Sequence, residues 1–294
     1  LRGNPHYEVT VARSQTAWHP ALATYFAEHE EDIKAFYAIQ REETTQRIAA
    51  GEIKTPEQKV HHNNARDDVA YRLYGINKWA GEQNIDLTLH LHINDYPHTR
   101  GVVGKYDGFA LYVPDPHFST ARASRALGEA IAERLAMYHA KSSLPDESEG
   151  VVESQKLIAV GANNTVDNVS ILIEYGYIYE PQFLHRATRE LAIRDYAYKT
   201  YLGLQDFFGD PVDDVDGTAA LPYAWKSANL EGKTTPDAYA LQSALRYLGH
   251  YPPKGKTFTE CPVSGRFSEC TEDAVKTFQE EHSIESIGVF GPQT

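Results

Sequence analysis

The sequence has little cysteine, a deficit of positive charge and no long apolar run. Its 294 residues include two cysteines and one methionine, and 28 Lys and Arg stand against 41 Asp and Glu, for a formal net charge of -13. This balance argues against general binding to DNA or RNA, because neutralising phosphates needs clustered Lys and Arg. No stretch of about 18 apolar residues occurs, so we expect no membrane span.

The two cysteines lie close together near the C-terminus. Cys261 and Cys270 are nine positions apart, and the first 260 residues contain none. This pattern suits an exported protein of the cell envelope or extracellular space that carries one local disulfide. Two free thiols in a reduced compartment are the alternative. A thiol titration before and after reduction distinguishes the two.

The order of apolar patterns predicts a larger α/β domain. Hydrophobic residues make up 41% of the chain, enough for a substantial core. Period-two and continuous apolar runs predict strands, and three-to-four spacing predicts helices. The expected strands cover 7–12, 85–94, 108–113 and 169–173, and the expected helical stretches cover 20–58, 64–82, 120–140 and 182–208. Strands that alternate with long helices are typical of an α/β sheet domain.

The chain divides into two expected domains. Residues 1–209 form the α/β domain, and residues 210–236, which are rich in Asp, Gly and Pro, read as a linker. A small helical unit follows over residues 237–294.

The strand over 85–94 carries two histidines that could bind a metal. Every odd position in it is aliphatic, so Thr88, His90 and His92 share the opposite face. Histidines two positions apart lie roughly 7 Å from each other, and neutral imidazole is a common zinc ligand. Alternatively they are surface or hydrogen-bonded histidines, since zinc usually takes at least three protein ligands. We expect His61 and His62, before Asn63-Asn64, to lie at the surface.

A second candidate residue ends the apolar run over 169–173. Glu174 follows Ile171-Leu172-Ile173, and Gly176 comes two residues later. A carboxylate beside an apolar wall has a raised pKa and can transfer protons. The alternative is a glutamate that leaves the sheet into solvent or pairs with an arginine.

Together these segments resemble the zinc-dependent N-acetylmuramoyl-L-alanine amidases of the type 3 family. The matching residues include Asp86, His92 and Asn94, preceded by Arg72 and Asn77, then Gly108 and Tyr112, and finally Ile173-Glu174-Tyr175-Gly176-Tyr177. The resemblance covers roughly residues 5–208 and implies a mixed, twisted sheet flanked by helices. It also implies His92 as a Zn²⁺ ligand and Glu174 as the catalytic acid and base, with His90 and Asn94 as neighbours of the site. The family usually has serine where this chain has His90.

One departure concerns the other zinc ligands. The family binds zinc through His, Glu and His, and its first His lies in a glycine-rich turn ahead of the segment that Leu1–Ser14 resembles. Neither that His nor the Glu is present, so we infer an N-terminal truncation. One ligand cannot hold catalytic zinc tightly, and we expect these 294 residues alone to be weakly active or inactive.

The C-terminal unit resembles the three-helix type of peptidoglycan-binding domain. Leu241-Gln242, Ala274-Val275-x-x-Phe278-Gln279 and Gly288-x-Phe290-Gly291-Pro292-x-Thr294 come in the family's order. The last of these nearly repeats Gly265-x-Phe267-x-x-x-x-Thr271, and Thr271 is expected to cap a helix. The third helix of that family would follow Thr294.

The leading hypothesis is therefore hydrolysis of the amide between N-acetylmuramic acid and L-alanine in peptidoglycan, by zinc-activated water. The first alternative is a non-catalytic cell-wall-binding protein with a degenerate amidase domain. Another wall hydrolase, such as a glycosidase, would need a carboxylate pair, and the sequence offers Glu174 no evident partner.

Overall fold

The computed structural model describes residues 5–53, 67–155, 157–161, 168–210, 223–226, 228 and 230–294. His61 and His62 lie outside the described residues, as do 211–222, 227 and 229 of the expected linker. The elements, in chain order, are α1 (Pro20–Glu28), α2 (Glu30–Ala49), α3 (Asp67–Glu82), β1 (Leu87–Asn94), β2 (Ala110–Pro114), α4 (Ala121–Ala136), η1 (Pro145–Glu147), β3 (Val151–Ser154), β4 (Val169–Tyr177), α5 (Pro181–Leu184), α6 (Arg186–Phe207), α7 (Pro236–Tyr247) and α8 (Glu269–Glu281).

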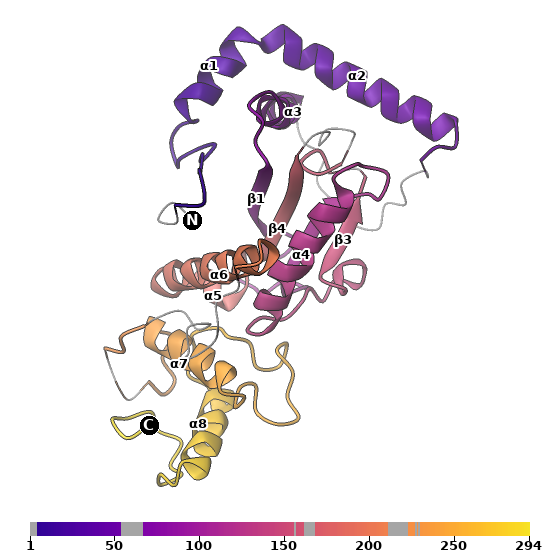
Figure 1. Ribbon diagram of the computed structural model, residues 1–294. Coiled ribbons are helices and arrows are strands. Elements are labelled where there is room, and N and C mark those ends of the chain that lie inside the picture. The colour runs from indigo at the N-terminus through magenta and orange to yellow at the C-terminus, as the bar shows by residue number, and fades with distance from the viewer. Residues whose placement is uncertain are drawn as a thin grey trace. The chain divides into compact units, whose positions relative to one another are not determined.

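The four strands form one sheet in the order β1-β4-β2-β3. Figure 1 labels β1, β4 and β3 of this sheet. β2 and β3 run parallel, with Leu111 beside Val151. β1 and β4 also run in the same direction, because the Val169 amide donates to the Asp86 carbonyl and the Ile178 amide to the Asn94 carbonyl. The prediction of an α/β domain with a sheet flanked by helices is confirmed. Among the described residues, no helix is long and apolar enough to cross a membrane.

One compact unit comprises residues 1–91, 111–128 and 151–173. In it, α3 packs against α1 and α2. Tyr25, Ile33 and Tyr74 form the buried cluster between these helices. Most residues of β2 and β4 in this unit are buried as well, because the apolar runs in these two strands leave no polar face for solvent.

The other unit comprises residues 92–110, 129–150 and 174–294, and it contains α5, α6, α7 and α8. α7 begins as its sequence predicts: Thr235 is the N-cap, its side chain accepts from the Ala238 amide, and Pro236 follows in the first turn. α6 packs against both α5 and α7.

The two similar motifs of the C-terminal helical domain, around Gly265 and Gly288, form the same hydrogen bonds with a glutamine side chain. The Gln242 amide accepts from the Gly265 backbone and donates to the Arg266 carbonyl and to Thr271 Oγ1. Gln279 repeats this pattern, since it accepts from the Gly288 backbone and donates to the Val289 carbonyl and to Thr294 Oγ1. Both glycines have positive φ, 77° and 72°, which lets the chain turn toward the glutamine.

Two local expectations are wrong. Thr271 does not cap a helix: α8 starts after Ser268, and the buried Thr271 instead accepts the hydrogen bond from Gln242. Residues 7–12 form no strand, and the nearest ladder contact is an isolated bridge between Arg13 and Trp18. On β1 the aliphatic face is not covered throughout, because Leu91 is 59% exposed, whereas His90 on the opposite face is 9% exposed. β1 lies at the edge of the sheet, so alternation alone does not decide which of its faces is covered.

The two cysteines form a disulfide. Cys261 is fully buried in the C-terminal helical domain, and Cys270 lies in the first turn of α8. Of the two possibilities that the sequence left open, the cross-link is therefore the observed one.

Candidate functional site

The two histidines of β1 differ in their environments. His90 is buried, whereas His92, two residues further along the strand, lies at the surface. Although His92 as a whole is exposed, protein atoms near its ring lower the pKa of His92 below the ordinary value, because they displace part of the solvent that would stabilise the charged imidazolium. At neutral pH His92 is therefore a neutral imidazole, the form that can donate a lone pair to a metal.

Glu174 lies on β4, next to β1 in the sheet. Its Oε2 atom is buried, and no side chain or backbone group among the described residues donates a hydrogen bond to it. Burial, together with the nearby charge of Glu147, raises the pKa of Glu174 from 4.5 to about 8. A carboxyl group with this pKa exchanges protons readily near neutral pH, which suits a general acid or base.

The register of the two strands relates His92 to Glu174. The hydrogen bond between Val169 and Asp86 fixes the register at the start of the pair. Carried along parallel strands, that register sets Glu174 beside His92, and side chains at the same level point to the same face. The hydrogen bond from the Ile178 amide to the Asn94 carbonyl corresponds to a register that is shifted by one residue. The two candidate residues therefore lie at the same level or one residue apart.

Glu147 is a carboxylate that the sequence did not single out. It ends the 3₁₀ turn η1 and is only 1% exposed. Ser142 Oγ donates a short hydrogen bond to it, and the Tyr177 hydroxyl donates another at 3.1 Å. No pattern in the loop around Pro145 marks this glutamate, because its meeting with β4 depends on tertiary packing.

Asn94 and Glu180 have structural roles at the end of the strand pair. The Asn94 side chain accepts from the Asp95 backbone at 2.8 Å, so it shapes the turn that leaves β1. Glu180 is buried, and burial raises its pKa to about 7 even though the Tyr177 and Gly108 backbones and the Gln182 amide donate to it. No sequence pattern marks Glu180 beyond its place before Pro181.

The described residues do not complete a zinc site. No group of three or more His, Cys, Asp or Glu side chains in the described part of the chain is arranged to hold a metal ion. His92 is the one expected ligand found at the sheet edge, and catalytic zinc usually takes three from the protein. The donor set seen here does not fit the ion.

The comparison with protein families finds a match in the C-terminal part of the chain. Residues 234–294 match the family model described as a peptidoglycan binding domain. This peptidoglycan-binding domain contains α7 and α8, and its sequence repeat is the pair of glutamine-centred turns described above. No curated protein gives a significant match to the chain.

The solved structures that are similar to the chain include two amidases. An N-acetylmuramyl-L-alanine amidase, Ami1, from Mycobacterium smegmatis is 15% identical, with a TM-score of 0.39, over 60% of this chain and 76% of that one. The CwlD amidase from Clostridioides difficile, solved in complex with the GerS lipoprotein, is also 15% identical, with a TM-score of 0.34, over 60% of this chain and 85% of that one.

Proposed function

We propose that this protein acts on bacterial peptidoglycan, with the C-terminal domain binding the wall and the α/β domain acting as an N-acetylmuramoyl-L-alanine amidase. The match of residues 234–294 to a peptidoglycan-binding domain carries the first part. The second part is supported by Glu174, whose Oε2 is buried without a donor and whose pKa is raised to about 8. Its motif and that of His92 resemble those of the zinc amidase family.

The role proposed for Glu174 is proton transfer. As a carboxylate it would take a proton from the attacking water, and as the acid it would give that proton to the leaving amine of L-alanine. Both steps need one carboxyl group whose two protonation states have similar free energies near neutral pH. Burial next to Glu147 provides that condition.

The proposed proton transfer is assigned to Glu174 and not to zinc, and the effect of zinc on hydrolysis is to be measured. The resemblance implies His92 as one ligand, but the described side chains offer no complete set. No step is therefore derived through a metal, and we expect the 294 residues alone to show weak hydrolysis or none. An exported location, in the cell envelope or outside the cell, follows from the same proposal.

The alternative is a non-catalytic wall-binding protein whose α/β domain is a degenerate amidase. The incomplete ligand set favours it specifically. Under this alternative the peptidoglycan-binding domain carries the whole function and Glu174 serves only the fold.

The experiment compares the wild-type chain with Glu174→Gln at equal amounts bound to purified peptidoglycan. New amino-terminal L-alanine is measured against time, with and without added zinc. Release by the wild type that falls at least a hundredfold in the variant supports the amidase proposal. Release that the substitution leaves unchanged rejects the role of Glu174. Because weak hydrolysis or none is expected of these residues in either case, zinc content separates the two functions: stoichiometric bound zinc favours the amidase, and its absence favours the non-catalytic alternative.

A further inference from the structure

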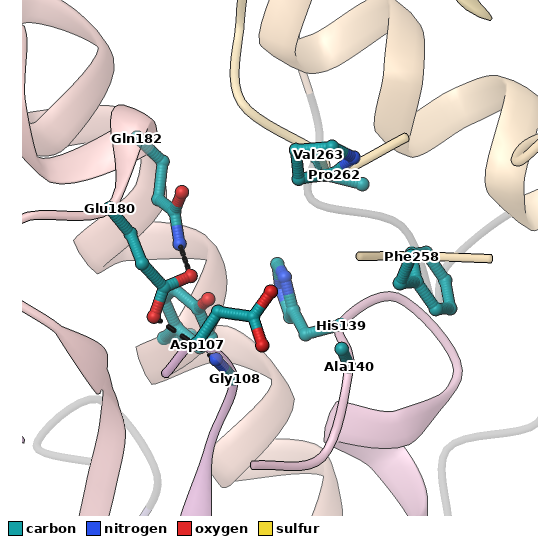
Figure 2. A pocket seen from close by; sticks show the side chains of 10 residues that line it. Asp107, Gly108, His139, Ala140, Glu180, Gln182, Phe258, Pro262 and Val263 are labelled. Carbon is teal, nitrogen blue, oxygen red and sulfur yellow. Dashed lines mark hydrogen bonds between the residues drawn. The ribbon is translucent and has the colours of Figure 1, made fainter. Parts of the chain in front are cut away.

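A small pocket in the second unit is lined by acceptor groups that nothing in the proposed reaction uses. Asp107 and Gly108 come from the segment before β2, His139 and Ala140 follow α4, and Glu180 and Gln182 lie at α5 (Figure 2). Tyr196 of α6 lines it as well. Phe258, Pro262 and Val263, from the loop between α7 and α8, form its apolar side. Its enclosed part accommodates a group about the size of a water molecule or an ammonium, and the pocket is open to solvent on one side.

Hydrogen bonds fix the orientation of Gln182. Glu180 Oε1 accepts from the Tyr177 and Gly108 backbones at 2.6 and 3.1 Å, and Glu180 Oε2 accepts from Gln182 Nε2 at 2.8 Å. Because the amide must turn its nitrogen toward this carboxylate, its oxygen points elsewhere. Gln182 is 4% exposed, and its Oε1 atom receives no hydrogen bond among the described residues.

Asp107 provides a second unmet acceptor with a negative charge. Its Oδ1 atom is buried and has no donor in the described part of the chain. The nearby His139 ring has its Nε2 committed to Asp195 at 3.2 Å, so that nitrogen is not available to Asp107. Figure 2 shows the Asp107 carboxylate directed into the space beside His139. A buried acceptor left without a donor is destabilising, so the pocket favours a guest that donates hydrogen bonds.

We propose that this pocket binds the primary ammonium group of an alkyl amine. An ammonium presents three N–H donors from one compact centre, which suits two acceptors and a carboxylate charge. The apolar side chains of Phe258, Pro262 and Val263 cover the methylene chain behind it. A metal ion fits less well, because the described residues form no cluster of three ligating side chains.

The natural source of this ammonium is a basic side chain of the peptidoglycan stem peptide, an assignment that rests on the proposed function. Free small amines have the same chemistry. The protein's net charge of -13 attracts either one, so charge alone does not distinguish them.

The test is calorimetric titration of the full chain with Nα-acetyl-L-lysine amide, with the same compound acetylated on Nε, and with n-butylamine. The lysine amide should bind saturably at one site, and Nε-acetylation should weaken binding at least tenfold because it removes the charge. Butylamine should bind more weakly than the lysine amide. Equal or tighter butylamine binding would overturn the stem-peptide assignment.

Two variants locate the site. Asp107→Asn keeps the shape of the side chain and should weaken lysine-amide binding at least tenfold, whereas Glu149→Gln removes an exposed carboxylate and should leave it unchanged. If Asp107→Asn does not fold, comparing the affinities of the wild type for the lysine amide and for its Nε-acetylated form shows whether the pocket binds an ammonium group. Failure to bind, or equal affinity for the acetylated compound, would mean that the pocket holds only water. Co-sedimentation of the same samples with peptidoglycan shows separately whether the wall-binding function stands.

Discussion

The Tyr239 hydroxyl donates a hydrogen bond to the buried carboxylate of Asp195 at 3.1 Å, across 44 residues of sequence. Tyr239 lies on α7 of the peptidoglycan-binding domain, and Asp195 lies on α6. Asp195 also accepts from Lys199 Nζ at 2.5 Å and meets His139 Nε2 at 3.2 Å. Burial alone would raise the pKa of Asp195, but Lys199 and His139 hold it below the ordinary value.

Tyr239→Phe removes one donor from this network and leaves the ring in place. Because the Asp195 carboxylate is fully buried, we expect the free energy of unfolding to fall by about 1–3 kcal/mol. Tyr37→Phe is the matched control, since its hydroxyl accepts an exposed bond from Arg41 and its loss should cost under about 0.5 kcal/mol. Urea unfolding measures the free energy of unfolding of both variants. Equal losses would mean that the hydrogen bond to Asp195 contributes no more than an exposed one.

Lys199→Met should be more damaging. Lys199 and Asp195 are 0% and 1% exposed at their side chains, so the substitution strands a buried carboxylate. Breaking a buried pair from one side costs about 3–5 kcal/mol. Lys34→Met removes an exposed ammonium that pairs with Glu30 and Glu31, and it should cost under about 1 kcal/mol. If adding Asp195→Asn to Lys199→Met restores no stability, the charge was not the cause.

The raised pKa of Glu174 predicts a pH dependence of stability. Its pKa is about 8 in the folded protein against an ordinary 4.5, so between these values the folded state holds a proton that the unfolded state has lost. The free energy of unfolding therefore falls as pH rises through this window, by at most about 1.4 kcal/mol per unit. Glu174→Gln should remove that loss in chelator-treated protein.

Thermal unfolding at pH 5 and pH 8.5 checks this. Glu174→Gln should be more stable than the wild type at pH 8.5 and close to it at pH 5. Glu149→Gln, which changes an exposed carboxylate, should leave the difference between the two pH values as in the wild type. A Glu174→Gln effect of the same size at both pH values would mean that the carboxylate is not desolvated.

The disulfide between Cys261 and Cys270 should stabilise the peptidoglycan-binding domain by about 2–4 kcal/mol, since closing the loop limits the unfolded chain. Thiol titration of the unfolded chain should find no free thiol before reduction and two after it. Reductant should lower the unfolding temperature of the wild type. The Cys261→Ser, Cys270→Ser double variant is the control, because reductant has nothing to act on there.

The sequence was sufficient where a single element carries its own pattern. The alternation over 85–94 and the apolar run over 169–173 both lie on strands, and the Gln242 and Gln279 motifs predicted the helical C-terminal domain. β3 went unrecognised because four residues, Val151–Ser154, are too few for a periodic pattern. Tyr7–Ala12 alternates in the same way but pairs with no other strand, and strand formation depends on a partner.

The candidate site was predictable only in part. Glu174 follows an apolar strand, so its burial was foreseeable from local sequence. The fold alone brings Glu147, from a separate loop, near Glu174. It likewise brings together the pocket acceptors Asp107, from a loop, and Gln182, from a short helix. The burial of His90 and the exposure of His92 on one strand likewise depend on which elements cover each position.

Co-sedimentation of the 294-residue chain with purified peptidoglycan tests the central claim most directly. We expect saturable binding to peptidoglycan, and soluble muropeptides should compete with it. Cellulose should not pellet the chain, and Glu174→Gln should bind peptidoglycan as the wild type does. A folded chain that stays in the supernatant at every peptidoglycan concentration would contradict it.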